Sequence, residues 1–259
     1  MKFSELTLTT NYLDLDPLFF HEVLPQPLQD PFIISVNQDA AKLLGVTQDL
    51  LSDKPLLEIL NGQQLLQGSK PFAMCYAGHQ FGYFVSRLGD GRAINLGKVN
   101  GWNLQLKGAG LTRYSRQGDG KAVLRSSIRE YLMSEAMYGL GIETTRALAL
   151  IGSNEDVARG KWEKAAMVLR LSPTWIRFGS FEFFAQAQTP KHLESLADYV
   201  IKESFAHLEG VSNAYLKMFE IIVEKTAILL AQWQSVGFNH GVMNTDNMSV
   251  GGLTIDYGP

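Results

Sequence analysis

The C-terminal segment restricts the fold most, because it places a polar loop and an Asp-Tyr-Gly after a long helix-type run. Segment 240–258 reads HGVMNTDNMSVGGLTIDYG. Its MSVGGLTI predicts a short strand, a turn and a second strand. Two carboxylates and an amide flank that hairpin: Asp246, Asn247 and Asp256. Oxygen ligands of this kind suit Mg²⁺, whereas many polar loops are only turn chemistry. Whether the segment is a metal site or a plain turn therefore depends on the elements that precede it in the chain.

The preceding chain is strand-rich first and helical later. For GYFVSRLGDGRAINLG we predict two strands joined by a tight turn at Gly89–Gly91, because Asp-Gly is a strong hairpin signal. WNLQLKG follows as a third strand, and AAMVLRLSP predicts a further strand that ends at Pro173. Segments Lys191–His207 and Ala214–Val236 predict two amphipathic helices.

Further helices are predicted nearer the N-terminus. Segment 37–60 has the spaced Ala and Leu residues of short helices. Another helix is predicted with Ser126 or Ser127 as its cap. Four apolar residues at helical spacing define one face of it: Ile128, Leu132, Ala136 and Leu140.

This order of elements is typical of an α+β, protein-kinase-like fold up to its metal-binding loop. We expect an N-terminal extension at 1–70, a strand-rich N-lobe with nucleotide-binding loops at 71–185, and the helical start of a C-lobe at 186–259. Because LTIDYGP stops just after a strand-like run, we expect this C-lobe to be truncated.

Composition excludes few function classes. Of the 259 residues 46% are hydrophobic and 19% charged, as in ordinary globular proteins, and the net charge of −3 gives no global attraction to nucleic acid or anionic membrane. Cys75 is the single cysteine, so an intramolecular disulfide is excluded. The N-terminus lacks a signal-peptide pattern, and no run reaches the roughly 18 apolar residues of a membrane helix. We expect a soluble, cytoplasmic protein.

Transfer from ATP requires a phosphate cradle and a cation upstream of the metal-binding loop. Gly89, Gly91 and Arg92 offer the cradle, although Gly-Asp-Gly is also a plain structural turn. Lys107 offers the cation, because it ends a strand on the face opposite Leu104 and Leu106. The alternative is an edge-strand lysine in solvent. The following helix supplies two possible carboxylate partners, Glu130 and Glu135.

Two arginines stand on apolar backgrounds where an idle charge is costly. These are Arg170 in VLRLSP and Arg177 in WIRFGSFE. Paired arginines bind phosphate well through their fork of donors. The alternative is one structural ion pair for each.

The polar loop departs from the kinase pattern at the position of the catalytic base. Kinase-like enzymes carry His-x-Asp-(four residues)-Asn and, after a short hairpin, Asp-Phe-Gly. Here His240 and Asn247 are in place, but Val242 stands where the catalytic aspartate is usual. Val242 cannot accept a proton, and Asp246 is the nearest substitute.

Several long segments together closely resemble the selenoprotein O family. They are YAGHQFGYFVSRLGDGRAINLG, LKGAGLTRYSRQGDGKAVLRSSIREYLMSEAMYGLGIETTRALAL, RFGSFEFF and AQWQSVGFNHGVMNTDNMSVGGLTIDYGP. The resemblance covers most of the chain from about Met74 onward. It implies a kinase-like fold that binds ATP in a flipped orientation and transfers AMP to Ser, Thr or Tyr hydroxyls of proteins.

The resemblance also implies roles for individual residues. The implied nucleotide-binding set is Gly89, Gly91, Arg92, Lys107, Glu130, Asp119, Gly120, Arg170, Arg177 and Asp256. Lys107 pairs with Glu130 in this scheme. Asp246 is the implied catalytic base, and Asn247 and Asp256 hold the metal, Mg²⁺ or Mn²⁺. His79 in GHQFG belongs to the pattern without an assigned chemistry, so we expect a hydrogen-bonded structural histidine.

Two other functions stay open. One is a conventional phosphotransferase, which the valine at position 242 disfavours. The other is a nucleotide-binding pseudokinase scaffold, which truncation favours. The sequence names neither the protein substrates nor the oligomeric state.

Overall fold

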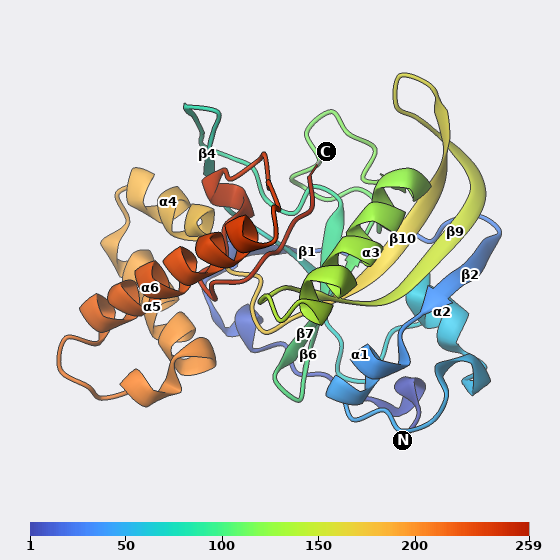
Figure 1. The fold of residues 1–259 in the computed structure, drawn as a ribbon, viewed down its shortest axis with the longest axis horizontal. Coiled ribbons are helices and arrows are strands. Elements are labelled where there is room, and N and C mark those ends of the chain that lie inside the picture. The colour runs from blue at the N-terminus through green and yellow to red at the C-terminus, as the bar shows by residue number, and fades with distance from the viewer. Residues whose placement is uncertain (259) are drawn as a thin grey trace.

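The computed structural model describes residues 1–258 and combines helices with one large antiparallel sheet (Figure 1). The strands are β1 (Phe20–Glu22), β2 (Pro31–Val36), β3 (Phe72–Met74), β4 (Gly78–Gln80), β5 (Tyr83–Val85), β6 (Ala93–Val99), β7 (Trp102–Lys107), β8 (Ala122–Val123), β9 (Arg146–Ala158) and β10 (Trp162–Ser172). The α-helices are α1 (Gln38–Leu43), α2 (Leu56–Leu60), α3 (Leu124–Gly139), α4 (Phe178–Gln186), α5 (Pro190–Ser204) and α6 (Ala214–Ser235). The 3₁₀ turns are η1 (Phe3–Glu5), η2 (Asn11–Asp14), η3 (Pro17–Phe19), η4 (Leu50–Ser52), η5 (Ala206–Leu208) and η6 (Thr245–Asn247). The predicted α+β class is confirmed.

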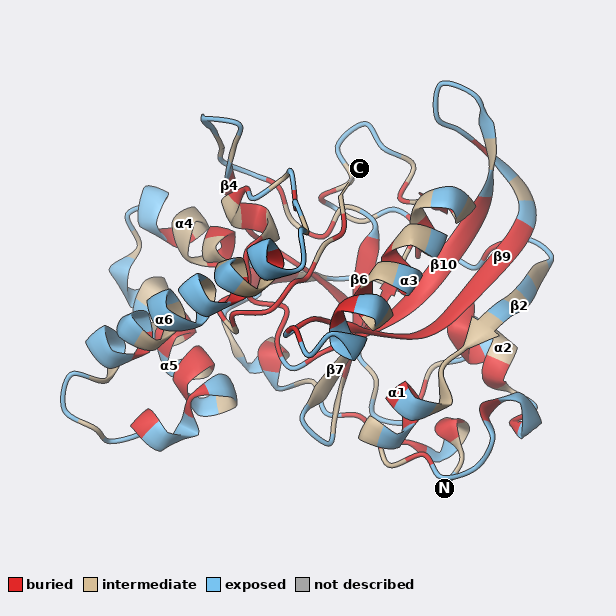
Figure 2. Ribbon diagram, in the orientation of Figure 1, coloured by how far each residue is buried: buried red, intermediate tan, exposed pale blue. Residues whose placement is uncertain are grey.

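The large sheet runs in the order β1-β3-β6-β7-β10-β9-β2, with β8 paired to β10. Its two longest strands, β9 and β10, form a hairpin whose half remote from the turn is buried on both faces (Figure 2). Side chains alternate along β10, because successive residues of a strand point to opposite faces. Leu169 and Leu171 join the main core beneath the sheet, while Val168 packs on the opposite face with Tyr131 of α3.

Helix α3 lies across that opposite face (Figure 1). Its orientation differs from the one that its apolar spacing predicts, because Ile128, Leu132 and Leu140 are exposed. The buried face instead carries Ser127, Glu130, Tyr131, Ser134 and Met137. The physical reason is charge: this face covers Lys107 and Arg170, and a buried cation needs a carboxylate partner. The predicted serine cap is also wrong, since the helix begins after Val123 without a side-chain cap.

The predicted hairpin at Gly89–Gly91 is wrong as well. β5 pairs with β4 in a separate two-stranded sheet, and β6 pairs with β3 and β7. Asp90 explains the difference, because its buried carboxylate accepts hydrogen bonds from the Met74 amide and the Asn95 side chain. These bonds hold the Gly-Asp-Gly segment against β3 rather than between two paired strands.

The helical part follows β10. α5 and α6 agree with the predicted helices to within a few residues, and the predicted short helices of segment 37–60 are α1 and α2. α4 was not predicted. It packs against α5 and shares with it an apolar cluster that includes Phe184 and Leu196. The predicted C-terminal hairpin reduces to a single bridge between Met248 and Thr254. None of the described helices combines the length and apolarity needed to cross a membrane.

Candidate functional site

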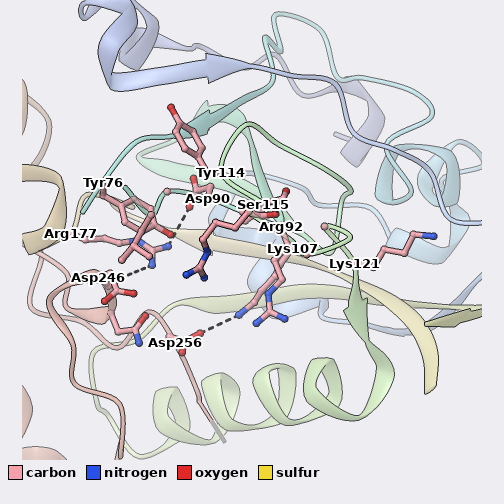
Figure 3. A pocket seen from close by; sticks show the side chains of 18 of the residues that line it. Tyr76, Asp90, Arg92, Lys107, Tyr114, Ser115, Lys121, Arg177, Asp246 and Asp256 are labelled. Carbon is pink, nitrogen blue, oxygen red and sulfur yellow. Dashed lines mark hydrogen bonds and ion pairs between the residues drawn. The ribbon is translucent and has the colours of Figure 1, made fainter. Parts of the chain in front are cut away.

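A cavity of about 540 Å³ opens where the ends of β6 and β7 meet the loop after α6. Segments far apart in the sequence line it: 88–93, 114–116, 118–121, Asp246–Asn247 and Ile255–Asp256. Figure 3 shows Lys107 and Asp256 meeting on one side of this space and Arg177 and Asp246 on another. Every residue proposed from the sequence to bind nucleotide or metal lines this cavity except Glu130, which lies behind Lys107.

A buried carboxylate joins two of the cations. Glu130 on α3 lies 2.5 Å from the Lys107 ammonium through one oxygen and 2.5 Å from the Arg170 guanidinium through the other. Strand pairing makes this possible, because Arg170 stands opposite Gln105, which accepts a second hydrogen bond from it on the same sheet face. Burial alone would raise the pKa of Glu130, but Arg170 and Lys107 outweigh it and hold that pKa below its ordinary value. Glu130 is therefore a charged anchor for both cations.

Asp256 is the second carboxylate near Lys107. Its Oδ1 lies 3.2 Å from the Lys107 ammonium. Burial alone would raise the pKa of Asp256, but the charges of Lys107 and Arg170 lower it to about 2. At neutral pH the group is therefore an anionic oxygen donor that lines the cavity.

Arg177 connects the sheet with the polar loop. Its guanidinium donates to the backbone carbonyl of Asp246 at 2.6 Å, lies 3.5 Å from the Asp90 carboxylate and stacks 4.5 Å above the Tyr76 ring. Burial raises the pKa of Asp90 against the opposing charge of Arg177. This arginine thus ties the backbone of the loop to β3 and to the turn after β5.

The alternative that each arginine forms one structural ion pair also holds in part. Arg170 and Arg177 are only 3% and 7% exposed, and each has one carboxylate partner among the described residues. Both nevertheless line the cavity. The Nε atom of each is buried and has no hydrogen-bond partner within residues 1–258. The ion pairs therefore do not exhaust the donors of either guanidinium.

The polar loop presents Asp246 to the cavity on the turn η6. Asp246 is 7% exposed; its Oδ2 accepts a hydrogen bond from Gln80 at 2.9 Å, while its Oδ1 has no partner among the described residues. Asn247 donates its Nδ2 to the Val242 carbonyl at 3.1 Å, which leaves its side-chain oxygen free to accept. The residue at the usual position of the base, Val242, thus contributes only its backbone.

The glycines of the 88–92 turn are required by packing. Gly89 has φ +100°, and a Cβ there would lie 2.4 Å from the Tyr114 ring. A Cβ at Gly91 would lie 2.8 Å from the Tyr114 carbonyl. Thr112 and Ser115 also donate to backbone carbonyls of this turn. The two loops therefore form one wall of the cavity, with the glycines at their contact.

Asp119 and Gly120 lie at the far end of the same wall. Arg159 donates to both oxygens of Asp119 at 2.6 and 2.8 Å, and that hydrogen bonding lowers the pKa of Asp119 to about 2. A Cβ at Gly120, whose φ is +73°, would meet the Gly110 backbone at 2.1 Å. Lys121 extends away from the acidic side of the cavity (Figure 3) and pairs with Glu155.

Comparison with known proteins identifies the family. A family model described as "Protein adenylyltransferase SelO" matches residues 2–259. The chain belongs to the SelO family. Relatives named "Protein nucleotidyltransferase YdiU" include one from Myxococcus xanthus, 50% identical across 98% of this chain and 53% of its own length, and one from Bordetella petrii, 49% identical across 99% and 54%. The relative from Variovorax paradoxus is 53% identical across 95% of this chain and 51% of its own. The chain spans about half the length of these curated relatives.

The donor set of this SelO-family chain fits Mg²⁺ better than a soft metal. No group of three or more His, Cys, Asp or Glu side chains gathers as a metal site within residues 1–258. The oxygen donors that line the cavity and were expected to hold the metal are the Asp256 carboxylate and the Asn247 amide. Mg²⁺ is usually held by one or two carboxylates together with substrate phosphates and water.

Several cavity residues of this SelO-family chain escaped sequence reasoning. They are Tyr76, Gln80, Asp90, Tyr114, Ser115, Arg116, Lys121 and Arg159. From the sequence, Asp90 is indicated only as a turn residue, and Gln80 in the GHQFG motif has no assigned chemistry. A usable signal was that both lie in the long segments that resemble the family. Tyr76 begins the first of these segments, whereas Arg159 lies outside all of them and no local pattern indicates it.

Proposed function

We propose that the protein transfers AMP from ATP to Ser, Thr and Tyr hydroxyls of protein substrates. The observation that carries this proposal is that the Asp246 carboxylate lines the same cavity as the cations Lys107, Arg170 and Arg177. Membership of the adenylyltransferase family supports it. Because the chain spans about half of its relatives, the proposal concerns the whole protein.

The cations of the cavity bind the triphosphate. Lys107, Arg170 and Arg177 contact phosphate oxygens, since ammonium and guanidinium groups bind these anions well. Glu130 holds two of them in place. On the opposite wall Gly89, Gly91 and Arg92 contact the nucleotide from the first loop, and Asp119 and Gly120 contact it in its flipped orientation.

Asp246 acts as the base. The substrate hydroxyl oxygen attacks the α-phosphorus, and its proton passes to the carboxylate of Asp246. The bond between the α-phosphorus and the oxygen that bridges to the β-phosphate breaks, and pyrophosphate leaves with that electron pair. The arginines stabilise the charge that develops on the phosphate oxygens.

Asn247 and Asp256 hold Mg²⁺ or Mn²⁺. When bound, the ion neutralises phosphate charge and helps to orient the triphosphate. Both residues line the cavity beside Lys107 or Asp246, which supports this assignment.

The proposal extends to fold and location. A strand-rich lobe at 71–185, preceded by an extension at 1–70 and followed by the start of a helical lobe at 186–259, is the arrangement of a kinase-like enzyme. The Lys107–Glu130 pair between a strand and a helix supports it. We place the protein in the cytoplasm, where ATP and protein substrates are available.

Label transfer tests the function. The full-length protein is incubated with Mg²⁺ and ATP labelled at either the α- or the γ-phosphate. We expect protein to be labelled from the α-position alone. Asp246→Asn keeps the shape of the base and should lower the transfer rate by about 10²- to 10⁴-fold while ATP affinity changes little. The matched control is Asp49→Asn, at an exposed position.

The other outcomes are equally clear. Label from the γ-position alone would overturn AMP transfer in favour of a phosphotransferase. Nucleotide binding without label from either position would identify a scaffold. Undiminished transfer by Asp246→Asn would remove Asp246 as the base.

A further inference from the structure

The GHQFG motif forms a small hairpin that covers the polar loop. It comprises β4 and β5, paired through Gly78–Val85, His79–Phe84 and Gln80–Tyr83. Figure 1 shows this hairpin standing beside α4, and both elements contact η6. The proposed phosphate-binding role of the cations gives this separate two-stranded sheet no function.

The hairpin approaches the base directly. Gln80 donates its side-chain amide to Oδ2 of Asp246 at 2.9 Å. A Cβ on Gly78 would lie 2.8 Å from Oδ1 and 3.0 Å from Cβ of Asp246. One oxygen of the carboxylate is therefore bonded, and the other is confined without a partner among residues 1–258.

The hairpin is also fixed to the residues before the base. The His79 amide donates to Thr245 Oγ1 at 2.8 Å, and the Phe81 amide donates to Asn244 Oδ1 at 3.2 Å. Glu182 of α4 closes the arrangement, because it accepts from Thr245 at 2.6 Å and lies 2.9 Å from the His79 ring. Successive loop residues from 244 to 246 are thus each hydrogen-bonded to this hairpin.

We propose that Gln80 is a positioning residue that selects the reactive oxygen of Asp246, an inference that rests on the proposed role of Asp246 as base. The two oxygens of a free carboxylate exchange by rotation. A donor on Oδ2 opposes that rotation and, with Oδ1 confined against Gly78, fixes which oxygen faces the cavity. A neutral amide does this without placing a cation beside the base.

The test separates positioning from binding and folding. Gln80→Met keeps the length of the side chain and removes the donor, and Gln80→Lys restores a donor of similar reach. In the full-length protein we expect Gln80→Met to lower kcat for AMP transfer by about 10²-fold, the effect of a small misplacement of a reacting group. KM and the dissociation constant for ATP should stay unchanged, as should the thermal midpoint. Gln63→Met, at an exposed position outside the cavity, is the matched control.

Crystal structures of the variants give a readout independent of activity. The Asp246 carboxylate should rotate in Gln80→Met and keep its orientation in Gln80→Lys. Unchanged kcat, or a raised KM with unchanged kcat, would overturn the inference while label transfer by the unsubstituted protein still upheld the proposed function. If the unsubstituted protein transfers no label, the proposed function fails; an unrotated carboxylate in Gln80→Met would then overturn the inference separately.

Discussion

The guanidinium of Arg177 donates to the backbone carbonyl of Asp246 across 2.6 Å. Arg177 stands at the N-terminal end of α4, and its backbone also bridges to Ser249 beyond the polar loop. One residue therefore fixes the loop through both its side chain and its main chain. Because Asp90 and Tyr76 contact the same guanidinium, the loop is tied to the strand-rich part of the molecule.

Replacing Arg177 should destabilise the fold, because the buried carboxylate of Asp90 then lacks its cation. We expect Arg177→Met to lower the free energy of unfolding by about 3 kcal/mol, because it leaves a buried carboxylate without its cation. Asp90→Asn in the same protein should recover part of that loss. Urea unfolding of both single variants and the double variant measures the coupling. Strictly additive losses would show that the two groups do not interact.

Glu130 should matter to stability as well as to nucleotide binding. Glu130→Gln leaves two buried cations with reduced compensation, so we expect a loss of about 3 kcal/mol in the free energy of unfolding. Affinity for ATP should fall, because Lys107 loses its anchor. Urea unfolding and titration calorimetry measure these effects, with Glu220→Gln on the exposed side of α6 as control. An unaltered ATP affinity would contradict the anchoring role.

Two glycines in helices should respond oppositely to alanine. A Cβ on Gly179 would lie 2.1 Å from the Ala77 carbonyl, so Gly179→Ala must displace backbone and should cost more than about 2 kcal/mol. Gly139, at the end of α3, has no atom within 4 Å of its Cβ position, and alanine there should stabilise by up to about 1 kcal/mol. Thermal unfolding of both variants is the measurement. Equal shifts would refute the steric explanation.

The free energy of unfolding should depend on pH in the acid range because of Asp119. Hydrogen bonding from Arg159 lowers the pKa of Asp119 from 3.8 to about 2, so its contribution is present above pH about 3.8 and lost as pH falls toward about 2. The carboxylate is 41% exposed, and solvent screening limits the contribution to below about 1 kcal/mol. Unfolding curves of the unsubstituted protein and Asp119→Asn should therefore converge over that range. A difference that persists at pH about 2 would contradict this cause.

The sequence determined the parts of the fold that depend on local pattern. The apolar alternation of β7 predicts that Lys107 lies on the face opposite Leu104 and Leu106, as it does. The apolar periodicity of α5 and α6 predicts both helices almost to their ends. The long segments resembling a known family predicted the family that the comparisons show. In each case the signal lies in neighbouring residues, and neighbouring residues impose the conformation.

Tertiary structure decided what local pattern could not. α3 buries the mixed face that carries Glu130 rather than its predicted apolar face, because two cations from the sheet require that carboxylate. The Asp-Gly signal at Gly89–Gly91 yields no hairpin, because Asp90 is captured by β3 and Asn95. Gln80 reaches Asp246 across 166 residues of sequence. A buried charge selects its partner by proximity in three dimensions, and the cost of leaving it unpaired exceeds the small preferences that local sequence expresses.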